Sequence, residues 1–96
     1  PASQSQLAGL DPKHGAIVLE LITREHWSDT EFETICASHG LMASGALEVV
    51  NEWAFETYDE ALLDEYDGYD VSPEIAEAVK EKMSADMMIN FFMKSS

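Results

Sequence analysis

The stretch from Phe32 to Phe55 constrains the fold most, because it predicts two helices that meet at a tight turn. Its sequence is FETICASHGLMASGALEVVNEWAF, and Gly40 stands where the turn needs a left-handed backbone. The spacing of the apolar residues is typical of a helix-turn-helix. In that arrangement the positions that face inward or close the core are Ile35, Cys36, His39, Leu41, Ala46 and Val49. The sequence therefore predicts a helix-turn-helix core.

Local signals before this corner predict where helices begin. Asp11-Pro12 is typical of a helix start, with Asp as the cap and Pro in the first turn, and we expect this helix to run to about Glu25. Ser28-x-x-Glu31 is a capping box, and Trp27 and Phe32 are spaced as a hydrophobic staple around it. The second helix should therefore run from Asp29 to about His39.

Three elements are expected after the turn. A third helix should run from Ala43 to Tyr58 and bury Leu47, Val50 and Ala54 beside Trp53. Asp67-Gly68 lies between two short apolar segments, which indicates a hairpin with a two-residue turn. Ser72-Pro73 then predicts a last helix. Its buried stripe would consist of Ile75, Val79 and Met83.

These elements predict a mainly α, helix-turn-helix or winged-helix-like single domain with a short acidic β-hairpin and a C-terminal helix. We expect one hairpin at most, and a helical domain over residues 10–83. Residues 1–9 are polar and small, which predicts a flexible tail or linker. Residues 84–96 are expected to extend the last helix or to form an interface, such as a homodimer contact through the apolar segment 87–93. Because the chain starts with Pro1 instead of Met, we also expect it to be a piece of a longer protein.

The net charge of −14, from 19 acidic and 5 basic residues, restricts the partners. Residues 26–79 contain no Lys or Arg. Nucleic acid and anionic membranes are expected to be excluded, because both are bound mainly through cations. The partners that such a field attracts are divalent cations and basic surfaces, either of another protein or of other domains of a parent protein. One cysteine and no apparent signal or membrane-spanning segment predict a cytoplasmic location.

A cluster of carboxylates in the second half of the chain is the first candidate site. Oxygen-rich clusters suit calcium or magnesium, so a divalent cation is the one cofactor that the sequence leaves open. An EF-hand is not expected, since placing Gly68 at the sixth loop position puts Leu63 at the first ligand position. The alternatives are a looser cation site and a solvated acidic surface. The candidate metal ligands are Glu60, Asp64, Glu65, Asp67, Asp70 and Glu74.

A second candidate is a row of glutamates on the third helix. Glu48, Glu52 and Glu56 follow one another at i, i+4 spacing, which costs about 0.2–0.5 kcal/mol for each like-charged pair. With Asn51 they form a predicted interaction surface, because a basic partner would relieve the repulsion. The alternative is that burial of the opposite face outweighs this cost.

Other chemistry-bearing residues are expected to be structural. Cys36 and His39 share a helical face and follow His26, so three zinc ligands are available in principle, but core positions explain Cys36 and His39. No orienting acid or oxyanion arrangement accompanies the cysteine, so we expect no catalysis. The aromatic residues predicted for the core are Trp27, Phe32, Trp53 and Phe55.

Three segments of the chain resemble the TerB-C family, the C-terminal domain of TerB-type tellurite-resistance proteins. They are LDPKHGAIVLELI, HWSDTEFETICASHGLMASGALEVVNEWAFE and DEALLDEYDGYDVSPEI, and the resemblance spans about Leu10 to Val79. It implies a non-catalytic accessory domain of a larger bacterial protein linked to tellurite, chemical stress or phage defence. The alternative function is calcium or magnesium binding through the acidic hairpin and the glutamate row. DNA binding and DNA mimicry are less favoured because of the charge.

Overall fold

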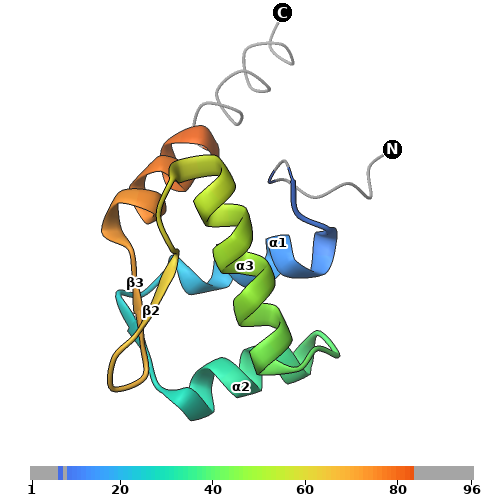
Figure 1. The fold of residues 1–96 in the computed structure, drawn as a ribbon. Coiled ribbons are helices and arrows are strands. Elements are labelled where there is room, and N and C mark those ends of the chain that lie inside the picture. Colours follow the sequence, from blue (N-terminus) through green and yellow to red (C-terminus); the bar gives the residue numbers. More distant parts are fainter. Residues whose placement is uncertain (1–6, 8, 84–96) are drawn as a thin grey trace, which may run out of the picture.

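A computed structural model describes residue 7 and residues 9–83 (Figure 1). Its antiparallel sheet has the strand order β1-β3-β2. The order helix, strand, helix, helix, strand, strand is that of a winged helix, so the predicted mainly α fold class is confirmed. The elements are α1 (Pro12–Leu21), β1 (His26–Trp27), α2 (Asp29–Ser38), α3 (Ala43–Tyr58), β2 (Leu63–Glu65) and β3 (Tyr69–Val71), followed by helical residues 73–83.

The predicted helix starts are confirmed by their caps. The side chain of Asp11 accepts a hydrogen bond from the backbone nitrogen of His14 at 3.3 Å. Both halves of the capping box at Ser28 and Glu31 are formed, with donor–acceptor distances of 2.9 and 3.1 Å. Helix α1 ends at Leu21, earlier than expected, and the indole nitrogen of Trp27 donates to the Leu21 carbonyl at 2.9 Å. That bond caps the end of α1 and turns the chain into β1.

The corner around Gly40 has the predicted geometry. Gly40 has a φ of +74°, and the backbone nitrogen of Leu41 donates to the carbonyl of Cys36 at 2.9 Å. This left-handed turn ends α2 and redirects the chain into α3. The bounds predicted for α3 are confirmed.

The sheet differs from the prediction of one hairpin at most, because β1 adds a third strand to it. His26 pairs with Asp70 and Trp27 with Tyr69. A two-residue strand has no periodicity, so the sequence carries no local signal for this long-range pairing. The hairpin loop also holds three residues, 66–68, between the paired positions 65 and 69 instead of the predicted two.

Gly68 in this loop has no room for a side chain. Its φ is +103°, and a Cβ atom there would lie 2.6 Å from the carbonyl oxygen of Trp27. The preceding Asp67 also has a positive φ, of 51°. The Asp-Gly pair therefore supplies the positive angles that the sequence predicted, and glycine also lets β1 lie against the hairpin.

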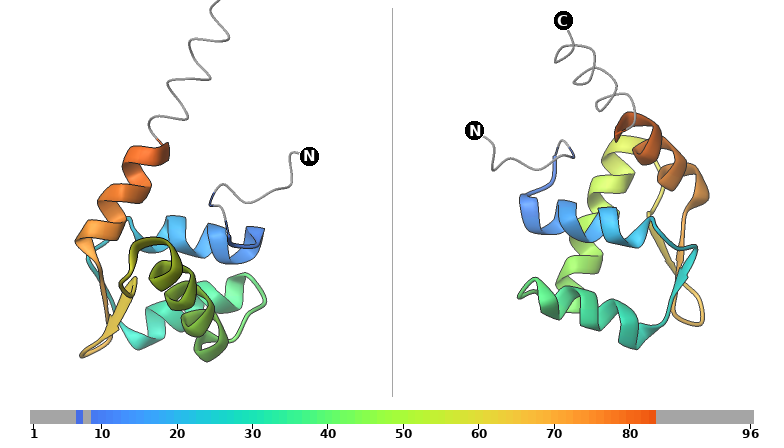
Figure 2. Two further views of the ribbon diagram at one scale, coloured as in Figure 1. Left: turned by 45° about the horizontal axis from the view of Figure 1, so that its top comes forward. Right: turned by 180° about the vertical axis from the view of Figure 1, so that it is seen from behind.

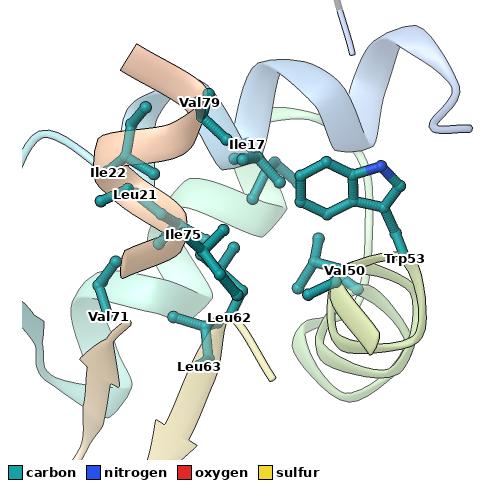
Figure 3. Packing of buried hydrophobic residues seen from close by; sticks show 14 of the residues in the cluster. Ile17, Leu21, Ile22, Val50, Trp53, Leu62, Leu63, Val71, Ile75 and Val79 are labelled. Atoms are coloured by element: carbon teal, nitrogen blue, oxygen red, sulfur yellow. The ribbon is translucent and has the colours of Figure 1, made fainter. Parts of the chain in front are cut away.

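The core lies between α1, α3, the sheet and helix 73–83 (Figure 3). Ile17 of α1, Val50 of α3 and Ile75 of the last helix are each at most 1% exposed. Leu7 lies in the predicted tail, yet its side chain is 2% exposed and belongs to this core. The other tail positions, 1–6 and 8, and the predicted apolar segment over residues 84–96 lie outside the described residues.

Two core assignments in α3 were wrong. Val49 is 38% exposed and Phe55 is 56% exposed, whereas Val50, Trp53 and Ala54 are buried. At about 100° per residue, Val49 and Phe55 fall outside the arc that faces α1 and α2. In Figure 1 α3 lies in front of α1, and the rear view in Figure 2 shows α1 in front of α3. One face of α3 therefore forms part of the molecular surface.

Candidate interaction surface

The outer face of α3 carries the predicted glutamate row. We define this face by Glu48, Val49, Glu52, Phe55 and Glu56, all of which are exposed. Successive glutamates are about 6 Å apart along the helix axis. Among the residues that the structure describes, none of the three carboxylates has an ion-pair partner. Within the described residues, no cation compensates the charges on this face.

The ends of α3 add to this electrostatic cost. No side chain caps its start at Met42, and its last turn contains Glu56 and no basic residue. A carboxylate near a helix C-terminus meets the negative end of the helix dipole. The helix is stabilised instead by the buried positions on its opposite side, namely Ala46, Val50, Trp53 and Ala54.

Asn51 was predicted for the same surface, but it has a structural contact. Its side-chain nitrogen donates to the carbonyl of Leu63 at 3.0 Å, and its side-chain oxygen accepts from the backbone nitrogen of Leu63 at 2.9 Å. The side chain is half-buried. Asn51 thus ties α3 to β2, and the glutamates with Val49 and Phe55 make up the exposed face.

Four of the six predicted metal ligands gather at one place beside the sheet. Glu60, Asp64, Asp70 and Glu74 line an open hollow of about 350 Å³, together with Ser72. Glu65 and Asp67 do not line it. Within residues 7 and 9–83, no three His, Cys, Asp or Glu side chains meet in a geometry that could hold a metal ion.

Glu60 and Glu74 form a close pair within this hollow. The Ser72 hydroxyl donates to Glu60 and also accepts from the backbone nitrogen of Ile75 at 3.3 Å, which caps the last helix. A hydrogen bond between the two carboxyl groups, and the negative charge of Glu60, raise the pKa of Glu74. The closeness of the two carboxyl groups thus makes it less favourable for Glu74 to lose its proton.

The residues expected to be structural, Cys36, His39 and His26, have different surroundings. Cys36 is fully buried, and burial raises the pKa of its thiol. The Nε2 atom of His39 lies 3.8 Å from a carboxylate oxygen of Glu20, and the Nδ1 atom of His26 lies 2.7 Å from Asp70. The core position predicted for Cys36 is confirmed, while His39 is only partly buried.

A comparison with models of known protein families identifies the family of this chain. The family model for the TerB-C domain matches residues 1–80. The chain belongs to the TerB-C family. The predicted resemblance is therefore confirmed, and TerB-C relates this domain to tellurite resistance. A search of curated proteins and a search of solved structures found no match.

Sequence reasoning missed three features of this TerB-C domain. The exposure of Phe55 could have been found from its helical position, which lies next to Glu48 and away from Val50. The contacts from Asn51 to β2 and from His26 to β3 had no such signal, because they join segments distant in the chain.

In the described part of this TerB-C domain, every helix is too short or too polar to span a bilayer.

Proposed function

We propose that this TerB-C domain is a non-catalytic acidic interaction module of a bacterial tellurite-resistance, stress-response or phage-defence system, and that it binds basic partners through the outer face of α3. The observation that carries the proposal is the row of Glu48, Glu52 and Glu56. All three are exposed and lack an ion-pair partner among the described residues. Two like-charged i, i+4 pairs disfavour the helix that bears them, by about 0.2–0.5 kcal/mol each. A basic partner turns this cost into binding free energy.

The fold and the charge together favour a protein partner over nucleic acid. In winged-helix proteins that bind DNA, the second helix of the helix-turn-helix enters the major groove. Here that helix is α3, and its outer face carries glutamates. Phosphate contacts require Lys or Arg, and residues 26–79 have none. The partner surface that complements α3 is basic, and we expect it on another domain of a parent protein or on a second cytoplasmic protein.

The surroundings of Cys36 support a non-catalytic role. The thiolate is the nucleophilic form of cysteine, and reactive cysteines are partly exposed near positive charge. Cys36 is fully buried, and its thiol has a raised pKa. This side chain is suited to packing at the corner between α2 and α3.

Crosslinking in cells tests the proposal. The full-length gene product that contains this chain is compared as wild type and as Glu48→Lys/Glu52→Lys/Glu56→Lys. A matched control reverses three exposed acids on other segments, Glu25, Glu33 and Glu77. We expect the α3 variant to lose crosslinks from residues of α3 to partners, while the control keeps them. Identical crosslinks for all three proteins would refute an interaction role for α3.

The hollow beside the sheet supports a second candidate function, the binding of calcium or magnesium. Four carboxylates line it, and two of them, Glu60 and Glu74, form a close pair. A cation between Glu60 and Glu74 would offset their mutual repulsion, with Asp64 and Asp70 in the lining of the same hollow. Saturating Ca²⁺ or Mg²⁺ after chelator treatment should then raise the melting temperature in about 0.15 M NaCl, where general charge effects are screened. No rise beyond that produced by NaCl would exclude this function.

A further inference from the structure

Phe55 is an exposed aromatic side chain that the fold does not explain. It is 56% exposed near the C-terminal end of α3, and Val49, six residues earlier in the same helix, is 38% exposed. At about 100° per residue, the two lie at opposite margins of the outer face, roughly 120° apart, with the three glutamates between them. Two apolar margins around an acidic centre make this face amphipathic.

Gly45 lies on the same side of α3 and is also unexplained by packing within the chain. It is exposed and helical, and a Cβ atom there would meet nothing within 4 Å. Glycine within a helix costs roughly 0.5–1 kcal/mol relative to alanine, and no contact of the described residues requires it here. Its effect is to leave α3 without a side chain at one point of the surface, where another backbone can approach closely.

Charge complementarity indicates what covers this face. Residues 26–79 supply no cation, so the occupant must bring positive charges at a spacing that matches the glutamates. Lys or Arg residues four apart on another helix have the same rise of about 6 Å as Glu48, Glu52 and Glu56. Packed helices lie 8–10 Å apart between axes, which brings apolar side chains of the partner over Phe55 and Val49.

We propose that the outer face of α3 binds a basic amphipathic helix of another protein, with Phe55 as its apolar anchor and the glutamate row as its specificity element. This inference rests on the proposed function and names the partner's chemistry. A large aromatic side chain buried by a partner can supply much of the affinity, and the neighbouring charges set orientation and association rate.

The test uses a defined probe. A synthetic helical peptide, with lysines four residues apart on one face and leucines beside them, is titrated into the full chain by fluorescence anisotropy. We expect Phe55→Ser to weaken binding about tenfold, as for a hot-spot aromatic. The matched control is Tyr66→Ser, because Tyr66 is also a solvent-facing aromatic, 75% exposed, in the loop between β2 and β3. A thermal melt of each variant verifies folding.

Two further peptides define the outcomes. A scrambled peptide of the same composition, with its lysines spread around the helix, should bind at least several-fold more weakly. A version broken by two prolines separates a helical from an extended occupant, and equal binding of that version would overturn the proposal. Unchanged binding of Phe55→Ser would overturn it as well. Phe55→Ser could leave peptide binding unchanged while the triple glutamate variant still loses its crosslinks in cells. That result would support the proposed interaction role of α3 and would refute the inference that its partner is a basic amphipathic helix.

Discussion

Single residues in this domain include acids whose placement opposes stability, and the Glu60–Glu74 pair is one case. Glu74 is held against Glu60, so its pKa is raised and the folded state binds a proton more tightly than the unfolded state. Stability from this proton is present at acid pH and is lost as the pH rises from the ordinary glutamate value of 4.5 through the folded-state pKa. The repulsion between Glu60 and Glu74 therefore outweighs the attraction of the Glu74 carboxylate to the positive end of the helix dipole.

Glu74→Gln should raise the melting temperature at pH 7. The amide removes one negative charge and still donates a hydrogen bond to Glu60. Because the wild-type carboxyl group becomes protonated in acid, the difference between the two proteins should shrink as the pH falls toward 4. Thermal melts across this pH range measure the effect. The control is Glu77→Gln, because Glu77 belongs to the same helix but lines a different hollow. This variant should show no comparable pH dependence.

Gly45→Ala should stabilise the fold by about 0.5 kcal/mol. The gain is expected at the lower end of the usual range, because Gly45 lies in the first turn of α3. A methyl group there meets no atom within 4 Å, so packing does not oppose the gain. Urea denaturation measures it. A loss of stability would show that the glycine has a structural role in the isolated chain.

At the scale of elements, local signals determined what could be predicted. Caps and turn residues are short-range features, and they placed the starts of α1 and α2 and the turn at Gly40 before α3 correctly. The strand β1 was missed because it exists only through its pairing with β3, over forty residues later in the chain. Phe55 was misassigned for a different reason, since an aromatic residue suggests a core position unless its helical angle is compared with the buried arc.

The same limit applies to the candidate surfaces. The glutamate row could be predicted because an i, i+4 pattern fixes a shared helical face. The hollow near the sheet could be predicted only as a cluster in sequence, since the contact between Glu60 and Glu74 depends on how the loop after α3 meets the last helix. The role of Asn51 required knowledge that β2 lies beside α3.

Asn51 connects two elements, and its removal should destabilise their contact. Asn51→Ala leaves the backbone N–H and carbonyl of Leu63 without their side-chain partners in a part-buried position. We expect a loss of about 2 kcal/mol in the free energy of unfolding. Asn51→Asp retains an acceptor for the N–H but places a carboxylate oxygen against the Leu63 carbonyl, so it should also destabilise the contact. Chemical denaturation compares the three proteins, and an unchanged alanine variant would contradict this account.

For the whole molecule, the structure combines a fold often used for DNA recognition with a charge distribution that opposes it. The helix-turn-helix corner, the hairpin and the third strand are present, but the exposed positions of α3 and the hairpin carry acids. A fold specifies where a surface lies, whereas the side chains specify what it binds. In this domain the corner around Gly40 orients an acidic helix, and that orientation is compatible with a basic protein partner.

The net charge of −14 should make stability depend strongly on salt. Exposed acids repel one another over the Debye length, which falls from about 30 Å at 0.01 M to about 8 Å at 0.15 M ionic strength. Raising NaCl over this range should increase the melting temperature on the order of 5 °C, equivalent to about 1 kcal/mol for a domain of this size. Differential scanning calorimetry measures the shift.

Glu52→Lys tests whether α3 contributes to that repulsion. The substitution replaces two like-charged i, i+4 pairs, with Glu48 and Glu56, by two attractive pairs, so it should stabilise the low-salt protein by about 1 kcal/mol. Its melting temperature should respond less to NaCl than that of the wild type, because salt screens attraction as well as repulsion. The same variant should bind the basic helical peptide more weakly. If Glu52→Lys is more stable but binds the peptide more weakly, the glutamate row is maintained for binding at a cost in stability. A loss of both stability and binding would contradict this interpretation.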